Sequence, residues 1–339
     1  MRKRISYFDV LRGVAIIGVI AIHSNGQGLN FTSDSFNFNF SLLWRQAINF
    51  SVPLFLSISG YFIVEQNIKS STEYVAFLKK QIPKVYIPCI FWSLIGLLMA
   101  VFLFGRPLLY ELFKLITFRT FGPYYFIALI IQYYLLLPFL KKFANMKGFV
   151  ITTAVSLSTT ILFFYIRYYT ITTLPLIIYA GLFPTWMVFF VYGLYLGSEG
   201  NICISNKWLI IGIIVSYTLS CVESYYLFSQ FSQAGDAVTA VKPTSFLYSL
   251  FIITFLFKNV DLIKISFLKY LGEISFGIYL IHVIILQFAI RALQGVSFTF
   301  SVQPLHQFGL VFLTILISCV IIVMAKMLFN RKVLKIVGF

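Results

Sequence analysis

The chain has 339 residues, of which 60% are hydrophobic and only 11% are charged, and its mean hydropathy is +0.93. A soluble domain carries about 25% charged residues to cover its surface. This composition therefore predicts a polytopic membrane protein that exposes apolar side chains to lipid. The formal net charge of +16 comes from basic residues in short stretches between apolar runs. No nucleic-acid motif accompanies them, which excludes nucleic acid as a partner.

Ten apolar stretches are long enough to be interpreted as membrane spans, because a helix needs about 20 apolar residues to cross the hydrocarbon core. They lie near residues 7–27, 44–64, 85–104, 123–140, 148–166, 175–197, 208–228, 244–257, 270–290 and 307–329. The fold class is therefore an all-α membrane bundle of about ten helices, formed by a single domain over residues 1–339. A segment at 105–122 has spaced apolar residues, as expected of a helix on the outer membrane surface.

The distribution of basic residues predicts the orientation of the bundle. With the N-terminus in the cytoplasm, inner loops hold 18 of the 26 lysines and arginines and outer loops hold 7. This bias follows the positive-inside rule and predicts that both termini are cytoplasmic. The first span contains Arg12 and His23 and is followed by no small-residue cleavage site, so we expect a retained helix and not a signal peptide.

The first span also carries its ionisable residues on one face. Arg12 and His23 are eleven residues apart, which is close to three helical turns and roughly 16 Å along the axis. Asp9 lies one turn before Arg12 and is placed to pair with it. Such a stripe is expected to face the bundle interior or a water-filled cavity. The alternative is that these are ordinary charges at the two membrane boundaries, and spacing alone leaves both interpretations open.

Five ordered stretches resemble acyltransferase family 3, the integral-membrane O-acyltransferases that modify bacterial glycans and other acceptors. They are DVLRGVAIIGVIAIH (9–23), SVPLFLSISGYF (51–62), KKQIPKVYIPCIFWSL (79–94), YYFIALIIQYYLLLPFL (124–140) and YLGEISFGIYLIH (270–282). The first has the family's arginine and histidine separated by ten residues. Two departures are Tyr125, where tryptophan is common, and a basic stretch that has lysines in place of arginines and is interrupted by Pro83.

The resemblance implies transfer of an acyl group, typically acetyl, from cytoplasmic acyl-CoA to a hydroxyl group. It assigns His23 the role of general base or of acyl-imidazole carrier, and these two alternatives stay open. Arg12, oriented by Asp9, is placed to bind the donor's phosphates or its thioester carbonyl. Lys79, Lys80 and Lys84 are candidate ligands of the CoA phosphates, although positive-inside topology alone also accounts for lysines there.

Further candidates for the substrate site lie in two of these stretches. Ser275, Tyr279 and His282 share one helical face, where they are placed to orient a substrate, assist His23 or join helices by hydrogen bonds. Ser59 precedes Gly60, and this pair is interpreted mainly as a close-packing site, with covalent nucleophile as the alternative role of Ser59. His306 has no supporting context and is expected at the surface.

The sequence thus predicts a multi-pass cell-membrane acyltransferase whose acceptor is a cell-surface glycan or its lipid-linked precursor. We expect acyl-CoA as co-substrate, no permanently bound cofactor and no metal. The four cysteines show neither C-x-x-C nor metal-ligand spacing and predict no disulfide framework; they are Cys89, Cys203, Cys221 and Cys319. The alternatives are a transporter or flippase for lipid-linked glycans, whose internal repeats we do not detect, and a non-catalytic sensory module.

Overall fold

The computed structural model describes residues 6–170, 174–198, 200–260, 262–294 and 300–339, and its regular secondary structure there is helical. The longer helices are α1 (Ser6–Ser24), α2 (Phe36–Ile48), α3 (Ser51–Ile63), α4 (Ser71–Phe104), α6 (Tyr125–Leu140), α7 (Met146–Tyr169), α9 (Phe183–Ser198), α10 (Asn206–Phe231), α12 (Pro243–Lys258), α14 (Ser275–Gln294) and α16 (Gln303–Leu328). Shorter elements are η1 (Asn25–Asn30), α5 (Leu108–Ile116), η2 (Gly122–Tyr124), η3 (Lys141–Phe143), α8 (Leu176–Tyr179), α11 (Ala234–Ala237), α13 (Ser266–Glu273) and α17 (Arg331–Val337).

Each of the ten predicted spans contains a helix, but the helices differ in length. In the described part of the chain, eight segments are long and apolar enough to cross a membrane. The spans predicted at 175–197 and 244–257 contain α9 and α12, which have 16 residues each. The all-helical membrane bundle is therefore confirmed, while the count of ten and the orientation of the termini stay predictions.

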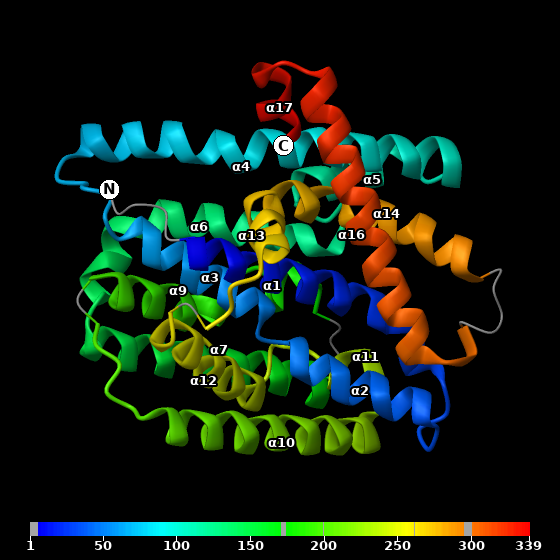
Figure 1. Cartoon of the computed structure of the whole chain (residues 1–339), viewed down its shortest axis with the longest axis horizontal. Helices are drawn as coiled ribbons and strands as arrows, with labels where there is room; N and C mark the ends of the chain where they lie inside the picture. The colour runs from blue at the N-terminus through cyan, green and yellow to red at the C-terminus, as the bar shows by residue number, and fades with distance from the viewer. Residues whose placement is uncertain (1–5, 171–173, 199, 261, 295–299) are drawn as a thin grey trace.

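Two helices, α1 and α9, form the centre of the bundle. They bury 14 of 19 and 12 of 16 residues, respectively. Figure 1 shows α1 running through the middle, with α4 above it and α10 below it in that view. A helix that is apolar on nearly all sides is typical of the centre of a large protein or of a membrane span, and both sequences are mostly apolar.

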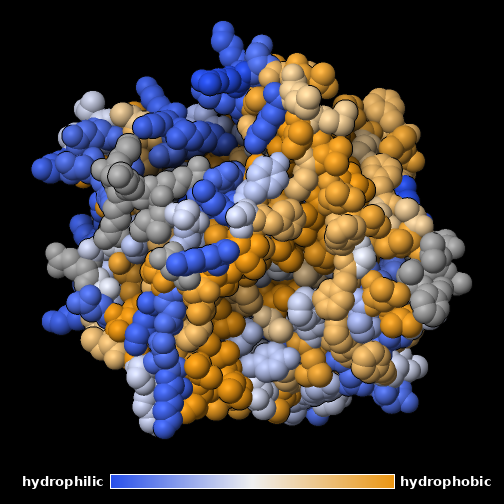
Figure 2. Space-filling model, viewed as in Figure 1, coloured by the Kyte–Doolittle hydropathy of each residue, from blue (hydrophilic) through white to orange (hydrophobic). Residues whose placement is uncertain are grey.

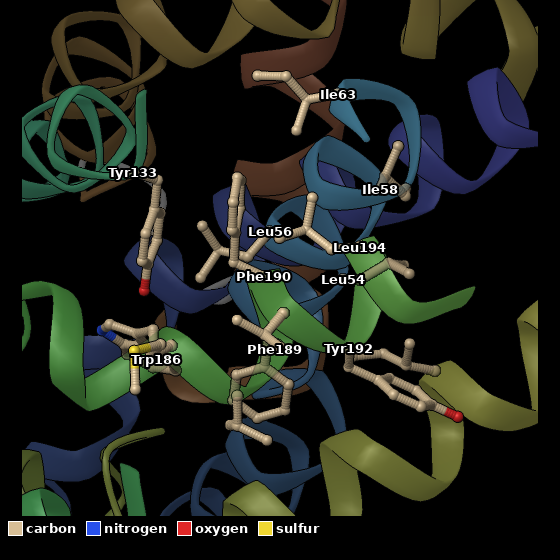
Figure 3. Packing of buried hydrophobic residues seen from close by; sticks show 14 of the residues in the cluster. Leu54, Leu56, Ile58, Ile63, Tyr133, Trp186, Phe189, Phe190, Tyr192 and Leu194 are labelled. Atoms are coloured by element: carbon tan, nitrogen blue, oxygen red, sulfur yellow. The ribbon is translucent and has the colours of Figure 1, made fainter. Parts of the chain in front are cut away.

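The contact between α3 and α9 builds the larger part of the core. Leu54 and Leu56 from α3 lie beside Phe189 and Phe190 from α9, as Figure 3 shows. Tyr133 from α6 stacks on Phe190 with ring centroids 4.5 Å apart. This packing fixes α3, one wall of the cavity described below, against the centre of the protein.

Peripheral helices bury small polar residues and expose large apolar ones. On α7 the buried positions are Gly148, Thr152, Ser156 and Thr160, at regular spacings of four. Its outward residues include Ile161 and Leu162, each more than half exposed. In water this pattern would be unfavourable, whereas in lipid small residues let helices approach closely and apolar ones face the chains. The packing thus agrees with a membrane environment.

Polar residues gather at one end of the bundle. In Figure 2 the hydrophilic residues lie chiefly along the left edge and at the top around α17, and a broad apolar surface occupies the centre and right. Figure 1 shows that α4 and α10 both begin at this left edge. The two views together indicate a polar end and an apolar belt.

A close crossing of α1 and α13 depends on two glycines. A Cβ atom on Gly13 would lie 2.0 Å from the carbonyl oxygen of Leu268, and one on Gly272 would lie 1.7 Å from that of Asp9. Backbones can approach this closely only where no side chain intervenes. The crossing covers the first turns of α1 and leaves Asp9 fully buried.

Replacement of Gly272 by valine is expected to destabilise the protein, because the new side chain would overlap the backbone of α1. Overpacking of this kind costs roughly 1–3 kcal/mol. Thermal unfolding in detergent should show a lowered midpoint for Gly272→Val. Gly235→Ala is the control, since no atom lies within 4 Å of a Cβ built there. Equal midpoints for both variants would contradict the crossing.

Candidate active site

A cavity of about 190 Å³ lies inside the bundle beside α1. Its walls come from α1, α3, α4, α6 and α14, and most of its lining is apolar or aromatic. Among the predicted site residues, those that line it are Arg12, His23, Ser59, Ser275 and Tyr279. The stripe on α1 therefore faces an internal cavity, and Ser275 and Tyr279 of α14 contribute to the same space, whereas His282 lies outside its lining.

The ion pair predicted between Asp9 and Arg12 is present. The guanidinium Nη1 of Arg12 donates to Oδ1 of Asp9 at 2.9 Å. Asp9 is fully buried, whereas the Arg12 side chain remains 29% exposed and lies over the ring of Phe62. A buried carboxylate requires a compensating cation. Asp9 thus orients a guanidinium that still faces the cavity.

His23 lies next to His282, with ring centroids 5.4 Å apart. Nδ1 of His282 lies 2.6 Å from the carbonyl oxygen of Tyr279. A carbonyl accepts only, so Nδ1 carries the proton and Nε2 is left as an acceptor. This Nε2 atom is buried and has no hydrogen-bond partner among the described residues. The two imidazoles form a pair in which one buried acceptor is available.

Arg45 is a site residue that the sequence interpretation missed, since it was counted among outer-loop charges. It lies on α2, where Nη1 donates to the carbonyl oxygen of Ile22 at 2.5 Å and Nε donates to Asn49 at 3.3 Å. Its charge acts on His23 and on Tyr125, which lines the cavity. A fixed cation therefore stands beside the end of α1 that carries His23.

The hydroxyl groups of the cavity are engaged in local hydrogen bonds. Ser59 donates to the carbonyl oxygen of Phe55 at 2.8 Å, and Ser275 donates to that of Gly272 at 2.8 Å. Tyr279 donates to the carbonyl oxygen of Pro123. These contacts give all three side chains a structural role in the cavity wall.

The predicted donor lysines lie outside the cavity. Lys79, Lys80 and Lys84 are exposed on α4, and Lys84 donates to Gln81 at 3.1 Å. Val85, the next residue along α4, does line the cavity. The lysines therefore occupy the surface beside one wall and are not part of the cavity lining.

The expected surface position of His306 is wrong. His306 is fully buried, and its Nε2 lies 2.9 Å from Oε1 of Gln27. The first turns of α16 pack against η1 and α2 through a polar cluster that includes Gln307, Asn25 and Ser41. Hydropathy predicted a loop there, but polar residues can be buried where they satisfy one another.

Comparison with protein families identifies the family of the chain. A family model described as an acyltransferase domain, Acyl_transf_3, matches residues 5–324. The chain belongs to acyltransferase family 3. The match covers all five stretches that carry the resemblance, together with His23 in the cavity and His282 beside His23. Comparisons with curated proteins and with solved structures give no match.

Family membership and the apolar helices make this chain a multi-pass membrane acyltransferase. The cavity suits the family's chemistry, because it combines an apolar lining with an imidazole and two guanidinium groups in or beside it. Among the described residues, no three His, Cys, Asp or Glu side chains form a metal-binding group. The imidazole and guanidinium groups in or beside the cavity are those of His23, His282, Arg12 and Arg45.

Proposed function

We propose that this chain transfers an acyl group, typically acetyl, from cytoplasmic acyl-CoA to a hydroxyl of a cell-surface glycan or of its lipid-linked precursor. The observation that carries the proposal is a cavity that contains both Arg12, towards the start of α1, and His23, towards its end. A donor and an acceptor that enter from opposite ends of such a space can meet beside His23. The proposed location is the cell membrane.

The polar end of the bundle is proposed to be cytoplasmic. It carries the beginnings of α4 and α10 and most of the exposed lysines, in agreement with the positive-inside rule. Arg12 and Asp9 then lie on the side where CoA is available. His23, about 16 Å further along the axis, lies on the side from which a glycan approaches.

His23 is proposed as the general base. It takes the proton of the acceptor hydroxyl, whose oxygen attacks the thioester carbonyl carbon. The carbon–sulfur bond then breaks, and the CoA thiolate leaves and receives the proton. His282 supports this role, because its buried Nε2, which has no partner among the described residues, is available to accept a hydrogen bond through a water from the second nitrogen of His23.

The two arginines have different proposed roles. Arg45 supplies a fixed positive charge where the oxyanion of the tetrahedral intermediate develops, and such preorganised charges are a major source of rate acceleration. Arg12, held by Asp9, binds the donor. The apolar and aromatic lining excludes water that would otherwise hydrolyse the thioester.

His23→Ala is expected to lower acetyl transfer by about 10²–10⁴-fold, the usual contribution of a general base. The assay uses the purified protein in nanodiscs with labelled acetyl-CoA and candidate glycans. Ser59→Ala is the matched control, since it removes a cavity hydroxyl that already donates to Phe55 and should retain activity.

Three other results would change the proposal. Equal transfer by wild type and His23→Ala would remove the role of His23. A labelled acyl group covalently bound to His23 in wild type would replace base catalysis with the acyl-imidazole route. Movement of lipid-linked sugar across vesicles without any transfer would favour the flippase alternative.

Arg45→Gln is expected to reduce kcat by about 10²–10³-fold with little change in donor KM, because the charge acts on the transition state. Arg45→Lys keeps the positive charge but lacks the two guanidinium nitrogens that donate to the carbonyl oxygen of Ile22 and to Asn49. Intermediate activity is therefore expected. Transfer rates at saturating donor measure both variants. Loss of donor affinity with an unchanged kcat would contradict the proposed role.

A further inference from the structure

The short helix α17 is held firmly against the bundle although it lies beyond the residues that the family model matches. Asn330 caps its start by accepting from the backbone amides of Lys332 and Val333, and Gly338 ends it with a φ of 80°. The indole Nε1 of Trp92, on α4, donates to the carbonyl oxygen of Val337 at 2.9 Å. These contacts give α17 a defined position on α4.

The end of α17 packs directly behind the cavity wall. A Cβ atom on Gly338 would lie 2.6 Å from Leu280, 3.0 Å from Pro88 and 3.2 Å from Phe276. Phe276 lines the cavity. The ring of Phe339 lies 5.8 Å from that of Trp92. The helix is thus attached at the junction of α4 and α14, where Phe276 lies between it and the cavity.

This position places a lysine of α17 beside the lysines of α4. The charge of Lys335 acts on Lys84, as does that of Lys80. All three side chains are exposed, and within the described residues none has a carboxylate at salt-bridge distance. We call Lys80, Lys84 and Lys335 the three-lysine cluster. Val85, the residue after Lys84 on α4, lines the cavity.

Like charges held together by fixed elements create a local positive potential that attracts anions. Ammonium groups bind phosphate as compact point charges. A ligand that pairs its charges with the three-lysine cluster and also enters the mostly apolar cavity must combine a polyanionic end with a long, thin, largely uncharged arm. The acyl-CoA donor has this chemistry, with a diphosphate at one end and the acyl-bearing pantetheine arm at the other.

We propose that Lys335 of α17 completes, with Lys80 and Lys84, a phosphate-binding site that holds the diphosphate of the donor at the mouth of the cavity. The inference rests on the proposed function, since it takes acyl-CoA as the donor. It adds a residue from outside the matched region to donor binding, and it gives α17 a role as part of the donor site. An anionic lipid headgroup offers the same phosphate chemistry, so the test separates the two sources.

The experiment measures binding of CoA itself, without transfer, to the full chain in nanodiscs of zwitterionic phosphatidylcholine. Lys335→Gln is expected to weaken CoA binding roughly three- to tenfold, the range for one partly solvated charged contact. In the transfer assay the same variant should raise the KM for acetyl-CoA at unchanged kcat. Its KM for acetyl-pantetheine, which lacks the diphosphate, should not change.

Two control variants keep the result interpretable. Lys207→Gln removes an exposed lysine at the start of α10, on the opposite side of the bundle from α17 in Figure 1, and should bind CoA as wild type does. Lys335→Arg keeps the charge and should restore most of the affinity. The exposed position of Lys335 predicts unchanged thermal stability for both of its variants.

The outcomes separate the inference from the function on which it rests. If wild type binds CoA and Lys335→Gln binds it equally well, the inference is overturned and the proposed function stands. The inference is also overturned if Lys335→Gln weakens the binding of anionic phosphatidylglycerol in the nanodisc but leaves the binding of CoA unchanged. If wild type itself does not bind CoA, the proposed donor is wrong and the inference falls with it.

Discussion

The close crossing of α1 with its neighbours is the constraint on which the site depends. Gly13 and Gly272 let α1 and α13 meet backbone to backbone, and Gly18 lets α1 meet Ser51 of α3. This contact buries Asp9, and the buried carboxylate then fixes Arg12. With α1 held in this way, its polar face has no route to lipid and can only line the cavity. The electrostatics of the site are thus a consequence of helix packing.

Much of the site follows from local periodicity. The helical repeat was sufficient to place Asp9, Arg12 and His23 on one face, because that relation depends on a single helix. The pairing of His23 with His282 was not predictable to the same degree. These residues are 259 positions apart, and their contact depends on how α1 and α14 cross, which no local pattern encodes.

The positions of two polar residues were not predicted correctly from the sequence. Arg45 lies at the start of the span predicted at 44–64 and was counted with the outer charges, yet α2 begins at Phe36 and places Arg45 against the carbonyl oxygen of Ile22, next to His23. His306 was expected at the surface because nothing in the sequence around it supports a role, yet it lies in a buried polar cluster. Tertiary hydrogen bonds compensate for the burial of His306 and for the partial burial of Arg45.

The central claim is that the cavity beside α1 is where the acyl group is transferred. Photo-crosslinking tests it most directly, with an acyl-CoA analogue that carries a diazirine on its acyl chain and with peptide mapping of the labelled protein. We expect adducts on cavity-lining residues of α1, α6 and α14, such as Val19, Phe126 and Tyr279, and their loss in excess acetyl-CoA. The claim would be contradicted if the adducts that excess acetyl-CoA prevents lay only on the peripheral helices α7 and α10.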